Sequence, residues 1–221
     1  MTDTTNTTDT DTTDTTDTAT SHDPRVQFAT ACRTVGDLIA SINDGELELL
    51  TPCHGFDVAG LLGHLDIVMT RVVALAEGTD PMALPETAPQ PKDGWHANWL
   101  RRMDHVATSW ADPETLQRTM TLPWASGPGS MLLSTYIAEL TVHTWDLATA
   151  LGRPAEFDEA VLDAALASYH VVLPEANRDE RFDAVRQFMP AGWEPPFHNA
   201  VDVPGDASTI DRIVAWTGRN P

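Results

Sequence analysis

The stretch YIAELTVHTWDLA, residues 136–148, most constrains how this chain can fold, because it places metal-ligand chemistry at helical spacing. Its apolar residues recur at three- and four-residue steps, which predicts a helix that buries one side in a core. They are Leu133, Ile137, Leu140, Leu147 and Leu151. Glu139, His143 and Asp146 lie within about 60° of one another on a neighbouring side. Burying such polar and charged side chains unpaired costs several kcal/mol, so these three residues are expected to have partners.

Composition bounds the classes of protein that are possible. With 221 residues, of which 42% are apolar, the chain can form one core of ordinary density. A formal charge of −20 and a single lysine, Lys92, exclude a partner held through phosphates, so no nucleic acid is expected. Cys32 and Cys53 are interpreted as reduced thiols. The absence of a signal peptide and of a long apolar run predicts a cytoplasmic protein with no membrane partner.

The chain divides into three parts by composition. Residues 1–21 are almost wholly Thr and Asp and are predicted to be a disordered acidic tail. Residues 22–152 are predicted to form a four-helix bundle, and residues 153–221 a C-terminal annex packed on it. The predicted fold class is mainly α, with a small α(+β) annex.

Apolar periodicity and capping residues place the individual elements. Helices are predicted over 24–43, 58–77, 94–110 and the central stretch, then over 158–169, 181–189 and 208–218. Residues 118–124 suit an extended piece, residues 126–129 a sharp turn, and residues 193–204 a loop with a possible strand. Asp66, beside His64 in the second helix, is expected to point into solvent.

Glu139 and His143 are four residues apart, so both side chains can reach one ion from the same helix. His64 is the best candidate for a third ligand, because it lies at the shoulder of the second helix's apolar side. Two His and one carboxylate suit a divalent transition metal with an open coordination position. Asp146 could bind weakly or orient an imidazole. From spacing alone, an ordinary polar pair at a core edge remains the alternative.

Four motifs together resemble a known family: TPC at 51–53, LLGHL at 61–65, ELTVHTWDLA at 139–148 and GRNP at 218–221. They are similar to the mycothiol-dependent maleylpyruvate isomerase family of DinB-like four-helix-bundle metalloproteins. The resemblance implies that His64, Glu139 and His143 hold a zinc-like ion. Phe56 stands where the family commonly has a tryptophan, and no arginine of the C-terminal third matches a catalytic one.

The same resemblance implies an S-transferase or isomerase that uses a metal-activated thiolate, with mycothiol as the thiol. Its partners would be a small-molecule thiol and an electrophilic substrate, and the protein would be a monomer or homodimer. A non-catalytic metal-binding or sensor bundle and a metal-dependent hydrolase remain alternatives. Tyr136, one turn before Glu139, could line the pocket or belong to the core edge. Cys53 could be activated by a helix dipole or be a buried structural thiol.

Overall fold

The computed structural model of the chain describes residues 23–186 and 195–221. The predicted acidic tail, residues 1–21, lies outside the described residues. Within the described part, the protein is mainly helical, with eight α-helices and a single two-stranded sheet. The predicted fold class is therefore confirmed.

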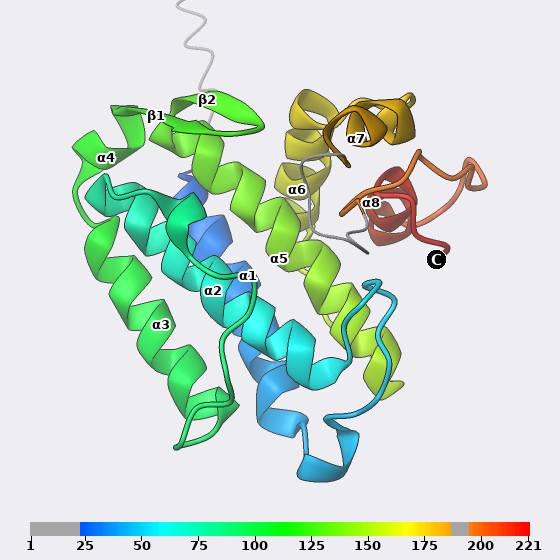
Figure 1. Cartoon of the computed structure of the whole chain (residues 1–221), viewed down its shortest axis with the longest axis horizontal. Helices are drawn as coiled ribbons and strands as arrows, with labels where there is room; N and C mark the ends of the chain where they lie inside the picture. The colour runs from blue at the N-terminus through cyan, green and yellow to red at the C-terminus, as the bar shows by residue number, and fades with distance from the viewer. Residues whose placement is uncertain (1–22, 187–194) are drawn as a thin grey trace, which may run out of the picture.

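Four long helices form a bundle (Figure 1). α1 and α2 each pack against both α3 and α5, so the four helices close a ring around one core. Their bounds are Pro24–Ser41 for α1, Val58–Glu77 for α2, Trp95–Ser109 for α3 and Gly129–Leu151 for α5. The predicted second helix matches α2 at both ends, and the predicted first and third helices extend one or two residues too far.

Capping residues explain where the bundle helices begin and end. The side chain of Asp23 accepts a hydrogen bond from the Arg25 amide at 3.0 Å, with Pro24 at the first helical position of α1. Asp57 accepts from the Gly60 amide at 2.7 Å at the start of α2. α2 ends at Gly78, whose φ of 74° is a left-handed conformation that favours glycine.

The bundle core is made by the apolar sides that the sequence predicts. Leu61, Leu65, Leu133, Ile137 and Leu140 are all buried in one cluster. Among the described helices, α2 alone is long and apolar enough to span a membrane. However, 72% of its apolar stretch is buried inside the protein. Its apolar character therefore fits the central helix of a bundle.

A short helix and a hairpin connect α3 to α5: α4 (Pro113–Gln117), β1 (Thr119–Leu122) and β2 (Ala125–Pro128). The strands are antiparallel, with Thr121 opposite Ser126 and their hydroxyl oxygens 2.9 Å apart. The extended piece at 118–124 is confirmed, but the turn predicted at 126–129 is wrong. The turn needs only Pro123 and Trp124, so the residues after it pair as a strand.

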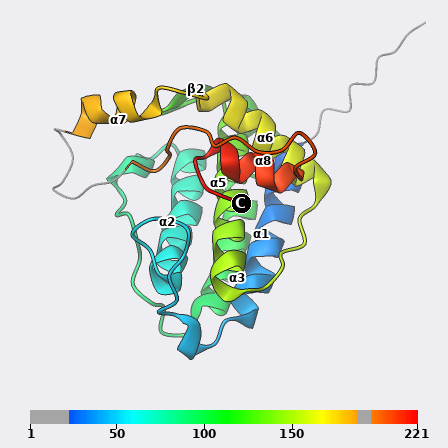
Figure 2. The same cartoon turned by 90° about the vertical axis from the view of Figure 1, so that its right-hand side faces the viewer.

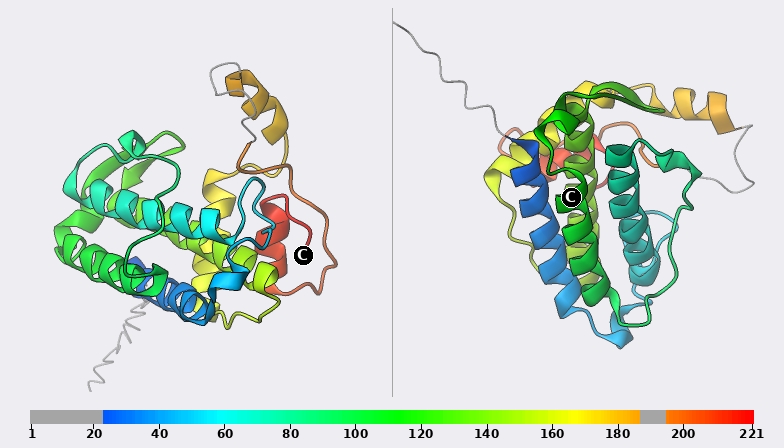
Figure 3. Two further views of the ribbon diagram at one scale, coloured as in Figure 1. Left: turned by 60° about the horizontal axis from the view of Figure 1, so that its bottom comes forward. Right: turned by 90° about the vertical axis from the view of Figure 1, so that its left-hand side faces the viewer.

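The C-terminal annex contains α6 (Glu159–Val172), α7 (Arg178–Arg186) and α8 (Thr209–Trp216). α6 packs on α5 and α1, and α8 packs on α6 and α5, whereas α7 stands away from the bundle (Figures 2 and 3). A second apolar cluster, which includes Val142, Tyr169 and Ile213, joins the annex to α5. Residues 195–204 contain no strand. The division into domains at residue 152 stays a prediction.

Asp66 does not point into solvent, contrary to expectation. Its side chain is 7% exposed and accepts hydrogen bonds from Arg102 Nε at 2.6 Å and Asn98 Nδ2 at 2.6 Å. Arg102 and Asn98 lie on α3, which packs on this side of α2. Burial of the carboxylate is compensated by this ion pair, a contact between helices that helical periodicity alone does not reveal.

Candidate metal centre

The three predicted metal ligands converge between α2 and α5, which run side by side in opposite directions (Figure 1). Glu139 and His143 lie one turn apart on α5, and His64 faces them from α2. His64 Nε2 is 3.3 Å from Glu139 Oε1, and the centroids of the two imidazole rings are 5.0 Å apart. One ligand atom from each of the three residues lies within 4.8 Å of the others.

Each histidine is oriented through its other ring nitrogen. His64 Nδ1 lies 3.1 Å from the carbonyl oxygen of Glu86, in the loop after α2. His143 Nδ1 lies 3.0 Å from Asp146 Oδ2. Both acceptors favour a proton on Nδ1, which leaves the Nε2 lone pair of each ring for another ligand. Histidine ligands of metal sites commonly have such a second partner.

Asp146 is in turn held by an arginine that the sequence did not single out. Arg219 Nε and Nη2 donate to the two oxygens of Asp146 at 2.8 and 2.9 Å, and the Asp146 side chain is fully buried. The interpretation of Asp146 as a residue that orients an imidazole fits this chain of contacts from Arg219 to His143. The motif at 218–221 contained the arginine, but nothing in the local sequence indicated its partner 73 residues away.

Burial and neighbouring charges oppose each other throughout the site. Burial would raise the pKa of Glu139, but the hydrogen bond and charge of His64 outweigh it and lower that pKa. Burial lowers the pKa of His143, and the hydrogen bond to Asp146 only partly offsets this. The pKa of Asp146 is lowered, because contacts with His143 and Arg219 outweigh its burial. The apo site therefore favours a neutral His143 between two carboxylates, as metal binding requires.

Cys53, Phe56 and Tyr136 border the three candidate ligands. The Phe56 ring stacks on that of His64, with 5.4 Å between centroids. Cys53 Sγ belongs to a second group of close ligand atoms, with His143 and Asp146. Burial raises the pKa of Cys53 to about 11, so this thiol is not an activated thiolate. Tyr136 is 1% exposed, and within residues 23–186 and 195–221 its hydroxyl has no hydrogen-bond partner.

Two imidazole nitrogens and a carboxylate oxygen are a donor set that suits zinc and similar divalent ions. The three residues fit such an ion, because they converge from two rigid helices and both rings are oriented by further contacts. The site is partly open to solvent, because the Glu139 side chain is 24% exposed and that of His64 is 12% exposed.

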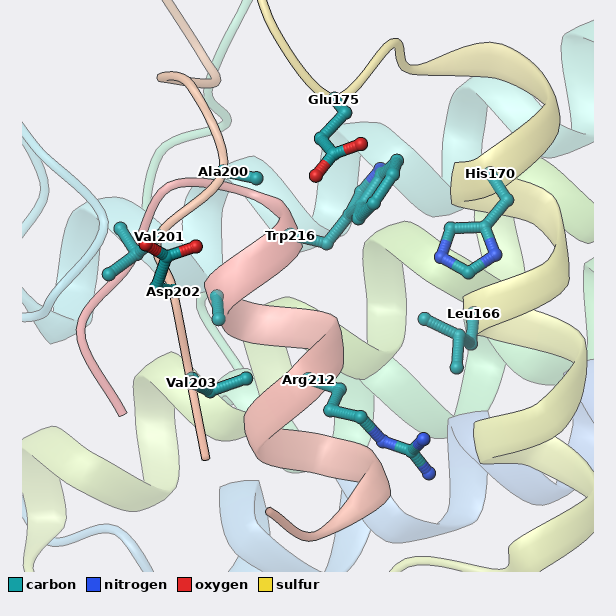
Figure 4. A pocket seen from close by; sticks show the side chains of 10 residues that line it. Leu166, His170, Glu175, Ala200, Val201, Asp202, Val203, Arg212 and Trp216 are labelled. Atoms are coloured by element: carbon teal, nitrogen blue, oxygen red, sulfur yellow. The ribbon is translucent and has the colours of Figure 1, made fainter. Parts of the chain in front are cut away.

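A separate cavity of about 300 Å³ lies within the annex (Figure 4). Leu166 and His170 of α6 face Arg212 and Trp216 of α8 across it. The Trp216 indole donates to the Leu173 carbonyl at 3.1 Å and lies against His170, with 4.4 Å between ring centroids. None of the candidate ligands lines this cavity, so it is distinct from the candidate metal centre.

Comparisons with known proteins place the chain in a family. A family model described as "Mycothiol maleylpyruvate isomerase N-terminal domain" matches residues 28–148. Two similar proteins are the uncharacterized proteins MT0763 and Rv0738 of Mycobacterium tuberculosis, from strains CDC 1551 / Oshkosh and ATCC 25618 / H37Rv. Each is 24% identical over 198 residues, which is 89% of this chain and 98% of the relative. No solved structure matches.

The matched region covers more than half of the chain and includes α2, α5 and all three candidate ligands. The family is linked to mycothiol and to metal binding, in agreement with the expectation from the sequence motifs. The chain therefore belongs to the mycothiol maleylpyruvate isomerase N-terminal domain family, with a helical DinB-like bundle.

Proposed function

We propose that this protein is a thiol-dependent S-transferase or isomerase that binds a divalent ion, zinc in the first instance, through His64, Glu139 and His143. The convergence of these three side chains in a chain of this family is the observation that supports the proposal. Mycothiol, or a thiol of similar size, is the proposed cofactor, and a small electrophile is the proposed substrate.

A divalent cation bound at this site would lower the pKa of an incoming thiol, so that a nucleophilic sulfur is available near neutral pH. The residues of the chain do the rest. Asp146 and Glu86 hold the two imidazoles in fixed orientations. Glu139 contributes negative charge that balances the cation, and its exposed side leaves a path for the thiol and for water.

The reaction balances without any redox partner. The sulfur electron pair forms a carbon–sulfur bond with the electrophile, and the thiol proton leaves to solvent. In transfer, the displaced pair departs with a leaving group. In isomerisation, the π pair of the double bond moves onto a conjugated carbonyl oxygen, and the former double bond rotates. The pair then returns, re-forms the double bond in the other geometry and expels the sulfur as a thiolate, which regains a proton from solvent. Transfer and isomerisation need the same contacts in the protein. The geometry therefore supports the class of reaction and does not single out one substrate.

The test combines metal analysis, thiol binding and turnover. Zinc-loaded protein is titrated with mycothiol by calorimetry, then incubated with mycothiol and a panel of electrophiles, and adducts are sought by mass spectrometry. We expect one ion per chain, saturable thiol binding and enzyme-dependent adducts. His105→Ala is a matched control, because His105 is a half-exposed histidine of α3 outside the cluster.

Activity that disappears in His143→Ala and persists in His105→Ala supports the proposal. A fully zinc-loaded wild-type protein that shows neither saturable thiol binding nor turnover with any electrophile overturns it. That outcome would make the protein a metal-binding bundle without catalysis. Turnover that requires zinc but no thiol would instead indicate a metal-dependent hydrolase.

A further inference from the structure

Two buried polar atoms near the candidate metal centre have no hydrogen-bond partner among the residues that the structure describes. They are Nε of Arg71, on α2, and the hydroxyl oxygen of Tyr136, on α5. Leaving such a group unpaired costs about 1–3 kcal/mol. Native proteins rarely tolerate this cost without a compensating role, so a ligand that pairs with both atoms would explain why they are retained.

The helix geometry places these two residues on the same side of the candidate metal centre, within about one helical turn of each other along the bundle. His64 contacts Glu139 across the α2–α5 interface, which fixes the register of the two helices. Arg71 lies two turns after His64, about 10 Å further along α2. Because α5 runs in the opposite direction (Figure 1), Tyr136, which precedes Glu139 on α5, is displaced along the bundle in the same direction as Arg71.

Arg71 is also held in place by the loop that orients His64. Its Nη2 donates to the carbonyl oxygen of Pro85 at 3.1 Å, and the next carbonyl, that of Glu86, accepts from His64. One end of the guanidinium is therefore anchored while Nε stays free. The positive charge of Arg71 also reaches both the Glu139 carboxylate and the Tyr136 phenol. It contributes to the lowered pKa of Glu139, and it slightly opposes the rise that burial causes in the pKa of Tyr136.

We propose that Arg71 and Tyr136 form an anion subsite next to the metal centre, which binds an oxyanionic group, such as a carboxylate, of the electrophile. A guanidinium N–H and a phenol O–H are both donors, and together they match an acceptor with two oxygens. The assignment of this anion to the electrophile rests on the proposed thiol-dependent function, whereas binding of an anion at Arg71 and Tyr136 does not.

Succinate binding to the zinc-loaded full chain tests the subsite directly, without turnover. Calorimetry is run with succinate and with succinamide, its neutral counterpart, on the wild type and on Arg71→Gln, Tyr136→Phe and Arg33→Gln. Arg33 is a matched control, because it is an exposed arginine of α1. Zinc content and circular dichroism are measured for each variant, and Arg71→Lys replaces Arg71→Gln if the latter does not fold.

We expect succinate but not succinamide to bind the wild type, with affinity at least about tenfold weaker in Arg71→Gln and unchanged in Arg33→Gln. Tyr136→Phe should weaken succinate binding and, in the absence of anion, raise the thermal unfolding temperature, because it removes a buried hydroxyl with no partner. The opposed changes in binding and stability would not arise from a purely structural tyrosine.

Succinate affinity in Arg71→Gln equal to that of the wild type, at equal zinc content, overturns the subsite. It would mean that the carboxylate binds the ion directly. The two proposals can also fail separately. If succinate binding depends on Arg71 but mycothiol does not bind, the subsite stands and the thiol-dependent function is wrong. If mycothiol binds but succinate binding does not depend on Arg71, only the subsite is wrong.

Discussion

His143 is the residue on which the contacts of the candidate site depend most. Its ring lies 5.0 Å from that of His64, and its Nδ1 contacts an aspartate that is itself held by Arg219. An imidazole fixed in this way loses little rotational freedom when a cation binds at Nε2. Removing the ring should therefore affect metal affinity far more than it affects the apolar core of α5.

His143→Ala should fold and lose its stoichiometric zinc, because only His64 and Glu139 would remain as ligands. Glu139→Gln keeps the shape of the side chain but removes its negative charge, so we expect zinc affinity about 10–100-fold lower and a shifted pH dependence of any activity. Zinc content after dialysis and competition with a chelator measure both effects. Zinc retained at one ion per chain in His143→Ala would remove His143 from the site.

The metal-free protein should lose stability as the pH falls below about 6.5. The unfolded chain binds a proton at His143 near its ordinary pKa of 6.5, whereas burial lowers that pKa in the folded chain. Between the two values the unfolded state binds more protons, so acid favours unfolding. Glu139 and Asp146, whose pKa values lie below 4.5 and 3.8 in the folded chain, act in the same direction at lower pH.

Urea unfolding in the presence of a chelator, from about pH 7.5 to about pH 5.5, measures this dependence. The wild type should lose stability more steeply with acid than His143→Gln, which has no imidazole at this position. Parallel curves for the two proteins would show that the folded and unfolded chains protonate His143 alike.

Residue patterns predicted part of the site and missed the rest for physical reasons. Glu139 and His143 were predictable because helical spacing alone places them together. His64 needed the additional assumption that two helices pair in one register. Arg219 was not predictable, because its contact with Asp146 depends on how the last residues fold back. The ion pair of Asp66 with Arg102 was missed because it depends on how α3 packs on α2, which helical periodicity does not reveal.

At the scale of elements, the loop between α2 and α3, which includes the 3-10 turn η2 (Pro81–Ala83), positions the site from outside the bundle. The Ala88 amide donates to the Gly63 carbonyl at 3.0 Å, and Glu86 accepts from His64. Gly63 allows this close approach, since a Cβ there would lie 2.5 Å from the Ala88 carbonyl oxygen. A segment without regular structure thus sets the orientation of a ligand on a regular helix.

Gly63→Ala should displace this loop and weaken zinc binding by about 10–100-fold, because His64 would lose its contact with Glu86. In an unhindered helix the same change stabilises by roughly 0.5–1 kcal/mol, so a loss of stability would reveal the steric conflict. Gly45→Ala is the control, since a Cβ there would approach nothing closer than Asn43 Oδ1 at 3.4 Å. Zinc competition and thermal unfolding report both effects.

A Gly63→Ala protein that is more stable than the wild type and binds zinc equally well would contradict this role of the loop.

Elements with strong local signals were predicted best: α2 has a capping aspartate, a long apolar side and a closing glycine. The second strand of the hairpin was missed because Ser-Gly-Pro has a low strand preference, and only pairing with β1 makes it extended.

At the scale of the whole molecule, the end of the chain folds back onto α5 of the bundle. After α8, Gly218 adopts a φ of 89° and approaches His198 so closely that a Cβ would lie 2.7 Å from the His198 Cβ. This turn directs Arg219 to Asp146 on α5. The annex therefore completes the contacts of a site whose candidate ligands all belong to the bundle.

Removal of residues 218–221 should leave the helices in place and still lower both stability and zinc affinity. Asp146 would become a fully buried carboxylate without its arginine, and breaking such a pair costs about 3–5 kcal/mol. Because Asp146 orients His143, zinc affinity should also fall, by about 10–100-fold. Arg219→Gln should reproduce both losses in the full-length chain, and Arg219→Lys, which keeps the charge but not the paired contacts, should lie between.

Thermal unfolding and zinc competition are measured on these variants and on Arg101→Gln, which is the control. Arg101 pairs with Asp93 at the surface, where both side chains are more than half exposed, so its loss should change stability little and leave zinc affinity unchanged. If the truncated chain and Arg219→Gln bind zinc as tightly as Arg101→Gln does, the annex stabilises the bundle but does not tune its metal centre. A shared loss of affinity would instead make the last four residues part of the functional unit.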